Sequence, residues 1–396
     1  MKKLHFSALT CVILSITFVS SALANHRTGE LALPELIVAG DFNEDGNRDL
    51  AVNVTGFDNI AILTGDGLGG FTLNGHIATD TLPKGLTAGD INRDRHIDLV
   101  GCSNWGYNAE VHLGDGLGGF GRRDNLVREE GGPNRALLAD FNKDGNLDLA
   151  VNGPDEGVLL IYLGNGKGKF LPPPFELEDL QHCLGFSAAD LNGDRNLDLA
   201  VVTSGQDHSV HIFLGDGTGN FTAGDTFAID PDGSNAAPGD LNNDGNLDLV
   251  VSGAGPENTT GNFITTYLGN GSGSFTEAQD IQLGGGNTKG PSALGDFNED
   301  GNLDVAFPQT GLRPGVGTKV LLFFGDGHGQ LVTQPPVTVG QEPHTVIAVD
   351  INRDHHLDLV VSNRTDGTVM TLLGSGNGGF TVSSNVSVVC LGGVCD

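Results

Sequence analysis

The stretch DFNEDGNRDLAV, residues 41 to 52, returns in close copies six more times along the chain. The copies begin at Asp90, Asp140, Asp190, Asp240, Asp296 and Asp350, so successive starts are 49, 50, 50, 50, 56 and 54 residues apart. A period of this length, flanked by short segments in which apolar residues alternate, is typical of a propeller or another closed array of repeats. The sequence therefore predicts an all-β repeat protein.

Each copy of the stretch has the composition of a calcium loop. Positions 1, 3, 5 and 9 are Asp, Asn, Asp and Asp in all seven copies. Calcium takes six to eight oxygen ligands, which three carboxylates, one amide and a main-chain carbonyl near position 7 can supply, whereas magnesium demands a stricter octahedron. We predict up to seven Ca²⁺ ions. Their ligands are Asp41, Asn43, Asp45, Asp49; Asp90, Asn92, Asp94, Asp98; Asp140, Asn142, Asp144, Asp148; Asp190, Asn192, Asp194, Asp198; Asp240, Asn242, Asp244, Asp248; Asp296, Asn298, Asp300, Asp304; and Asp350, Asn352, Asp354, Asp358.

Two other interpretations of the loop are weaker. An EF-hand loop ends with Glu at position 12 between two helices, but position 12 here is Val, Gly or Phe, and the residues that follow, such as LDLAVN, alternate like strands. Turn preference explains Asp, Asn and Gly in one copy, but it does not explain Asp at positions 1, 5 and 9 in all seven. Position 6 is Gly in four copies, and Arg95, Arg195 and His355 replace it in the others. We expect these three loops, in repeats two, four and seven, to bind calcium most weakly.

A second motif recurs in every repeat, some 25 residues after the start of the first. It reads GDGLGGF ending at Phe71 in the first repeat, and Leu331 replaces the terminal Phe in the sixth. Its glycines permit tight turns at positive φ, and its aromatic residue is expected to pack between neighbouring repeats. No helix follows the motif, which argues against nucleotide binding. With the segments on either side, the two motifs divide each repeat into four short strands joined by turns.

The pairing of these motifs resembles the FG-GAP or VCBS-type repeat, the unit of the seven-bladed propeller at the head of integrin α subunits and of many exported bacterial proteins. The resemblance covers residues 36–389. It implies a seven-bladed β-propeller of four-stranded antiparallel blades, with calcium-binding loops between the first and second strands. The departures at position 6 and at Leu331 bear on individual sites and not on the fold.

The N-terminal 24 residues have the pattern of a secretory signal. Lys2 and Lys3 precede an apolar run from about Leu9 to Val19, and the segment ends in Ala22-Leu23-Ala24. We predict four parts: a signal peptide (1–24), an N-terminal segment (25–35), the propeller (36–389) and a C-terminal tail (390–396). The product is expected to be secreted, periplasmic or at the cell surface, a monomer, and without a membrane span.

The remaining composition fits an exported protein that does not bind nucleic acid. The whole chain has 50 acidic and 20 basic residues, and it lacks the clusters of Lys and Arg that phosphate binding requires. In an oxidising compartment the spacing CLGGVC permits a disulfide between Cys390 and Cys395, while Cys102 and Cys183 are expected to be buried thiols.

Strand direction predicts where a ligand binds. In an up-and-down blade the metal loops and the glycine turns share one face, so the irregular connections lie on the other face, where binding residues are commonly found. Trp105 and Tyr107 occur there beside Asn104, and they suit a sugar ring or a protein partner, or else cap the blade.

Three classes of function remain open. The chain is an extracellular or periplasmic binding module for a protein or a glycan, an envelope scaffold, or a carbohydrate-active enzyme such as a polysaccharide lyase or hydrolase. A binding module is favoured, because the sequence shows no catalytic motif such as GxSxG or HExxH. His208 and His211 lie at strand positions and are expected to be structural, and Lys289, Arg313 and His344 are the scarce cationic groups of the predicted binding face.

Overall fold

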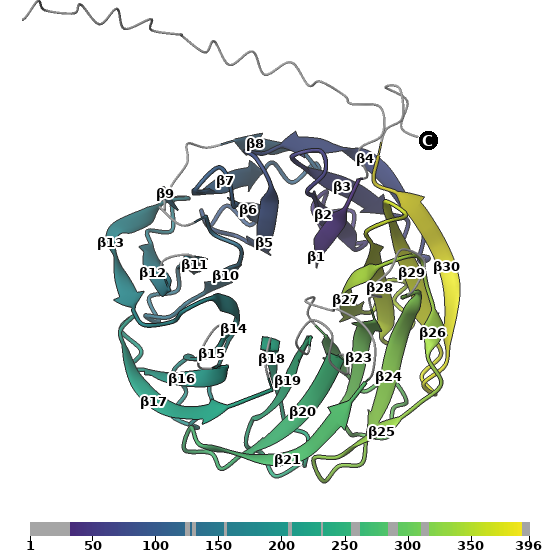
Figure 1. The fold of residues 1–396 in the computed structure, drawn as a ribbon. Helices are drawn as coiled ribbons and strands as arrows, with labels where there is room; N and C mark the ends of the chain where they lie inside the picture. The colour runs from purple at the N-terminus through teal and green to yellow at the C-terminus, as the bar shows by residue number, and fades with distance from the viewer. Residues whose placement is uncertain are drawn as a thin grey trace, which may run out of the picture. The chain divides into compact units, whose positions relative to one another are not determined.

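The computed structural model describes residues 32–122, 127–128, 132–153, 157–204, 208–230, 233–254, 262–283, 292–309 and 317–389. These residues form seven antiparallel sheets arranged as the blades of a ring (Figure 1). The prediction of an all-β, seven-bladed propeller is confirmed, and no helix occurs in the described part of the chain. It follows that no described helix is long and apolar enough to cross a bilayer.

The first four blades take their strands from residues 34–228. Blade 1 contains β1 (Pro34–Gly40), β2 (Asp49–Val54), β3 (Asn59–Gly65) and β4 (Phe71–Ala78). Blade 2 contains β5 (Pro83–Gly89), β6 (Asp98–Ser103), β7 (Asn108–Gly114), β8 (Phe120–Arg122) and β9 (Val127–Arg128). Blade 3 contains β10 (Ala136–Ala139), β11 (Asp148–Gly153), β12 (Val158–Gly164) and β13 (Phe170–Leu177). Blade 4 contains β14 (Cys183–Ala189), β15 (Asp198–Thr203), β16 (Ser209–Gly215) and β17 (Phe221–Ala228).

The remaining blades follow the same order. Blade 5 contains β18 (Gly233–Gly239), β19 (Asp248–Ala254), β20 (Asn262–Gly269) and β21 (Phe275–Gln282). Blade 6 contains β22 (Ala293–Gly295), β23 (Asp304–Gln309), β24 (Lys319–Gly325), β25 (Leu331–Thr333) and β26 (Val337–Thr338). Blade 7 contains β27 (Pro343–Val349), β28 (Asp358–Asn363), β29 (Thr368–Gly374) and β30 (Phe380–Ser387). The first strand of a blade lies nearest the centre and the fourth lies outermost (Figure 1).

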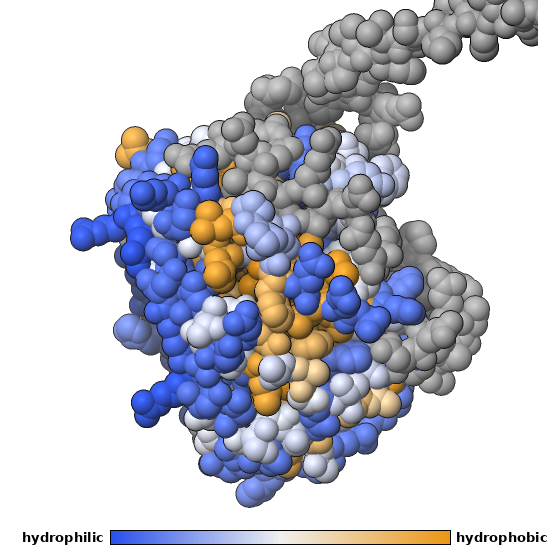
Figure 2. Space-filling model, turned by 90° about the vertical axis from the view of Figure 1, so that its left-hand side faces the viewer, coloured by the Kyte–Doolittle hydropathy of each residue, from blue (hydrophilic) through white to orange (hydrophobic). Residues whose placement is uncertain are grey.

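The hydrophobic core lies between blades. The second strands are rich in Leu and Val and are buried along nearly their whole length, as in β11 and β15. Each apolar cluster joins residues of two adjacent blades, so every blade buries its two faces against its neighbours. Seen from the side, hydrophilic side chains cover much of the described surface, and apolar side chains gather on part of the outer wall (Figure 2).

The aromatic residue of the glycine motif packs against the preceding blade, as expected. Phe120, Phe221 and Phe380 each meet, edge to face, the aromatic residue at position 2 of the metal loop one blade earlier, with ring centroids 5.5, 5.6 and 5.7 Å apart. Leu331, which replaces the aromatic residue in blade 6, is buried in the equivalent cluster. The main chain adds to this contact where Gly118 N–H donates to the Phe42 carbonyl oxygen at 3.0 Å.

Position 4 of the metal loop also reaches the next blade. The Glu44 carboxylate lies 2.6 Å from His96 Nδ1, Arg93 donates to the Gly145 carbonyl oxygen at 2.6 Å, and Lys143 donates to Asn196 at 2.6 Å. Within the described residues, contacts of this kind also join Asn243 to Asn302 and Glu299 to His356. In blade 4 position 4 is Gly193, which has no side chain to make such a contact.

The ring closes between blades 7 and 1 without a shared strand, because each blade takes all its strands from one stretch of chain. Ser362 Oγ donates to the Glu35 carbonyl oxygen at 2.8 Å, and His76 Nε2 lies 3.0 Å from the Val388 carbonyl oxygen. Ile37 and Val360 belong to one apolar cluster across this seam. Closure therefore depends on packing and hydrogen bonds of the same kind that join the other blades.

The Glu35 carboxylate adds an ionic link across the seam. It lies 2.7 Å from Lys84 Nζ in blade 2 and 3.2 Å from an Arg364 nitrogen in blade 7. Burial raises the pKa of Glu35, but the nearby His344, Lys84 and Arg364 lower it by more. Burial lowers the pKa of His344 itself, so Lys84 and Arg364 carry the firmer positive charges beside Glu35 and favour its ionised form.

Cys102 and Cys183 are buried free thiols, as predicted. Burial raises the pKa of the Cys183 thiol to about 12 and raises that of Cys102 as well. The predicted disulfide partners Cys390 and Cys395 lie outside the described residues.

The glycine that ends each third strand has no room for a side chain. A Cβ atom on Gly164 would lie 2.0 Å from the Leu147 carbonyl oxygen. We expect Gly164→Ala to lower the free energy of unfolding by about 2 kcal/mol or more, because the added methyl group would clash with main-chain atoms, whose displacement would distort the loop. A thermal or chemical melt measures the change.

Gly121→Ala is the matched control, since the nearest atom to its Cβ would be 3.9 Å away. Equal midpoints for the two variants would show that the close approach at Gly164 is not a constraint on the fold.

Candidate calcium loops and the opposite face

The aspartate at loop position 9 is buried in every blade. One of its carboxylate oxygens accepts the backbone N–H of loop position 2, and the other accepts the N–H of the glycine that ends the third strand. For Asp148 these donors are Phe141 N at 2.9 Å and Gly164 N at 2.7 Å. The same pair of bonds, at 2.8 or 2.9 Å, occurs in the other six blades. The position-9 carboxylate thus joins the metal loop to the glycine turn.

Burial changes the acidity of this carboxylate. It raises the pKa of Asp98, Asp148 and Asp304 to about 6, against the lowering effect of the two backbone hydrogen bonds. The pKa values of the other four position-9 aspartates are also raised, mainly by burial. A nearby cation would favour the ionised form and oppose this effect.

Positions 1, 3 and 5 fold the loop around their own oxygens. In blade 3 the Asp140 carboxylate accepts Gly145 N–H at 2.9 Å, the Asn142 amide oxygen accepts Asp144 N–H at 3.0 Å, and Asp144 accepts Asn146 N–H at 2.8 Å. The backbone hydrogen bond from position 7 lowers the pKa of Asp45, Asp144 and Asp194, so these carboxylates stay ionised. The amides of each loop therefore hold its acids close together without neutralising them.

The donor set fits calcium in kind and number. Each loop has four side chains that offer only hard oxygen ligands, and each carboxylate oxygen that accepts one N–H keeps a further lone pair. In blade 1 the buried Asp41 Oδ1 has no hydrogen-bond partner, so this oxygen keeps its lone pairs for a ligand. Within the described ranges, no three acidic, histidine or cysteine side chains converge as a preformed metal site. Calcium binding would therefore require the side chains at positions 1, 3 and 5 to turn toward a common centre.

The turn between β6 and β7 lies at the end of blade 2 opposite the metal loops. Trp105 is 68% exposed and Tyr107 is 49% exposed in this turn. Asn104 donates its side-chain N–H groups to the Gly132 carbonyl oxygen at 2.7 Å and to Asn134 at 2.8 Å, which ties the turn to the edge of blade 3. The two exposed aromatic rings are consequently carried by an anchored turn.

The other predicted groups of this face have different surroundings. His344 is partly buried and belongs to the charged cluster around Glu35. His211 lies on β16, stacks on Phe213 and contacts Thr203 Oγ1 at 3.2 Å, which agrees with the structural role expected for it. His208 precedes the same strand, and Lys289 and Arg313 lie outside the described residues.

Comparison with known families identifies the repeat. The model of the FG-GAP-like repeat matches three times, at residues 90–151, 140–201 and 198–251. These segments begin at or close to the metal loops and cover blades whose strand order repeats around the whole ring. The chain contains FG-GAP-like repeats within a seven-bladed propeller.

Solved structures show the same fold at low sequence identity. A putative 6-phosphogluconolactonase from Bacteroides fragilis has a TM-score of 0.62 at 13% identity, over 90% of this chain and 95% of that one. A protein from Lactobacillus plantarum has a TM-score of 0.59 at 12% identity, with 89% and 96% covered. BBS1N, crystallised in complex with ARL6DN, has a TM-score of 0.59 at 10% identity, with 85% and 91% covered. No curated protein matched the sequence.

The loops of the FG-GAP propeller differ in backbone strain at position 6. Gly46, Gly145, Gly245 and Gly301 have φ between 81° and 90°, and Arg95, Arg195 and His355 adopt similar values of 76°, 70° and 72°. Left-handed backbone costs a residue with a side chain about 1 to 2 kcal/mol. Position 4 is also left-handed in every loop, although only Gly193 is a glycine there. The sequence did not indicate this second strained position, because six of the seven loops have Glu, Arg, Lys or Asn there and no glycine pattern marks it.

Relief of this strain gives a test. We expect Arg195→Gly to raise the free energy of unfolding by about 0.5 to 1 kcal/mol, because glycine adopts φ near 70° without a steric penalty but loses more backbone entropy on folding. Paired thermal melts of the mutant and the wild type measure the gain.

Arg195→Ala separates backbone strain from the loss of a charge, since alanine keeps the Cβ atom. An equal gain in the alanine variant would attribute the effect to charge and contradict the backbone explanation.

Proposed function

We propose that this FG-GAP propeller is an exported calcium-binding protein that acts as a binding module for a protein or a glycan. In this proposal the seven loops hold calcium on one face, and the ligand is bound on the opposite face. The observation that carries the binding role is the pair of exposed aromatic rings, Trp105 and Tyr107, on the anchored turn between β6 and β7.

Several contacts support a preorganised site at this turn. Asn104 N–H donates to the Leu82 carbonyl oxygen at 3.0 Å, and Asn108 donates to the Asp80 carboxylate at 2.5 Å. Large aromatic side chains supply contact area at a low entropic cost, and rigid attachment reduces that cost further. Exposed Trp and Tyr are typical anchors of protein interfaces and of sugar-binding surfaces.

The comparisons support a binding role only at the level of the fold. BBS1N was crystallised with a protein partner, so a propeller of this architecture can present a surface to another protein. The nature of the ligand in the present case is inferred from the turn itself.

Calcium would act on the loops and not on the ligand. It would bind positions 1, 3, 5 and 9 of each loop and neutralise carboxylates that are otherwise close to one another. Because the loop geometry exists only in the folded chain, binding would stabilise the propeller according to the ratio of free calcium to the dissociation constant.

The metal part of the proposal predicts a calcium-dependent melt. We expect chelation to lower the melting temperature of the mature protein by several degrees or more, and calcium to restore it, with up to seven ions counted by native mass spectrometry. The loops with Arg95, Arg195 and His355 should fill last. A melt that chelator leaves unchanged, with no bound ions, would contradict the metal assignment.

The ligand part predicts an effect of the two aromatic residues. We expect Trp105→Ala combined with Tyr107→Ala to abolish binding to the hits that the calcium-loaded wild type gives on glycan and extracellular-protein arrays. The variant should melt as the wild type does, because both side chains are largely exposed.

Leu117→Ala is the matched control, since Leu117 is 81% exposed but lies in a glycine turn on the metal-loop face. Binding that survives the double aromatic change and is lost in Leu117→Ala would place the ligand on the wrong face for this proposal.

A further inference from the structure

The third strand of blade 2 departs from the apolar pattern of the other blades. His112 pairs with Leu99 in the β6–β7 register, and the six equivalent positions hold only apolar or aromatic residues. These are Leu63, Tyr162, Phe213, Tyr267, Phe323 and Leu372. Two residues earlier, Glu110 occupies the register that holds Ala61, Leu160, His211, Thr265, Leu321 and Met370 in the other blades. Among these described strands, blade 2 alone therefore has ionisable groups at both positions.

Glu110 and His112 are buried completely and lie beside each other. Both side chains have zero exposure, and His112 Nε2 is 3.4 Å from Glu110 Oε2. Glu110 Oε1 also accepts Asp80 N–H at 3.1 Å. Neither ring nitrogen of His112 has a hydrogen-bond partner. Burial of such groups costs free energy unless a partner compensates for the lost water, so a ligand is the natural source of the missing hydrogen bond.

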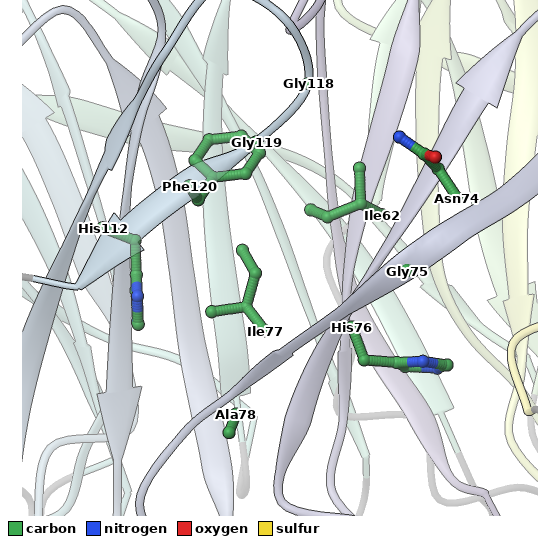
Figure 3. A pocket seen from close by; sticks show the side chains of 10 residues that line it. All are labelled: Ile62, Asn74, Gly75, His76, Ile77, Ala78, His112, Gly118, Gly119 and Phe120. Carbon is green, nitrogen blue, oxygen red and sulfur yellow. The ribbon is translucent and has the colours of Figure 1, made fainter.

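A pocket lies directly beside this histidine. Its volume is about 400 Å³, and His112 lines it together with Ile62, Ile77, Phe120 and Asn74 (Figure 3). The pocket runs between β4 of blade 1 and the β7–β8 region of blade 2, where β7 pairs with two short outer strands within the described residues. A bulge at Asn74, between the Leu63–Leu73 and Ile62–Gly75 pairs, shapes its other wall. The space suits a small organic molecule with an apolar body.

The Glu110 carboxylate, 3.4 Å from His112, bears on the head group of that molecule. A negative charge next to Nε2 favours the tautomer with its proton on Nε2, which leaves Nδ1 as a hydrogen-bond acceptor. We infer that the pocket between blades 1 and 2 binds a small apolar molecule that carries a neutral hydroxyl group, of the size of an alkylphenol, with the hydroxyl donating to His112. A carboxylate ligand is disfavoured, because it lacks a donor and would bring a second negative charge close to Glu110.

This site contains none of the predicted calcium ligands and no residue of the turn that carries Trp105. Three probes with the same ethylphenyl body test it by isothermal titration calorimetry on the full-length mature protein: 4-ethylphenol, its methyl ether and 4-ethylbenzoate. The phenol should bind about tenfold more tightly than either of the others, as expected for one buried hydrogen bond. Equal binding of phenol and ether, or tighter binding of the benzoate, would overturn the assignment.

His112→Leu tests the residue itself. Leucine occupies the same register in blades 1 and 7, so the variant should fold and melt no lower than the wild type. It should lose the preference for phenol over ether. Retention of that preference in the folded variant would exclude His112 as the acceptor.

Two further variants test the wall and the orienting carboxylate. A Cβ atom on Gly75, which lines the pocket, meets nothing within 4 Å, so we expect Gly75→Leu to occupy the pocket and to abolish binding of all three probes. Glu110→Gln keeps the shape of the side chain but removes its charge. It should reduce severalfold the ratio of the affinity for the phenol to the affinity for the benzoate. Unchanged discrimination would show that Glu110 does not orient the imidazole, and undiminished binding in Gly75→Leu would place the probes elsewhere.

Discussion

A buried carboxylate holds each blade of this propeller in register. The position-9 aspartate begins the second strand and accepts one N–H from the loop before it and one from the glycine that ends the third strand. A side chain in place of that glycine would meet the main chain of the loop, as Gly164 shows. The regular spacing of the two motifs is thus the consequence of one hydrogen-bonded junction between the acid and the glycine, which is repeated seven times.

The blades are joined by the same elements that define them. The aromatic residue that follows each glycine turn packs against the preceding metal loop, and position 4 of most loops reaches the next loop. Loops that are candidates for calcium therefore also contribute to contacts between blades. Neutralisation of their carboxylates would act on the ring as a whole, because each loop is hydrogen-bonded or packed to a neighbour.

Much of this architecture is predictable from the sequence, because repetition makes weak local signals reliable. The seven blades, the four strands of each, the shared face of both motifs and the packing of Phe120 or Phe221 between blades all follow from spacing and alternation. The hydrogen bonds of Asp148 to main-chain groups could not be predicted. An aspartate that binds a metal ion and one that accepts backbone N–H groups are the same residue in the sequence. In the sequence, Glu110 and His112 differ from their equivalents only in being ionisable at two strand positions that are apolar in most other blades. That difference can be recognised only when the strand register of all seven blades is known.

The missing side chain at Gly193 has a consequence for how the ring comes apart. Contacts from position 4 link most neighbouring loops, but the interface between blades 4 and 5 cannot have one. Every interface between blades resembles the one between blades 7 and 1, so no single interface holds the ring closed. The lifetime of the folded state is therefore set by the interface that opens fastest. Blades 4 and 5 are the natural place for that first opening, at a point far in sequence from either terminus.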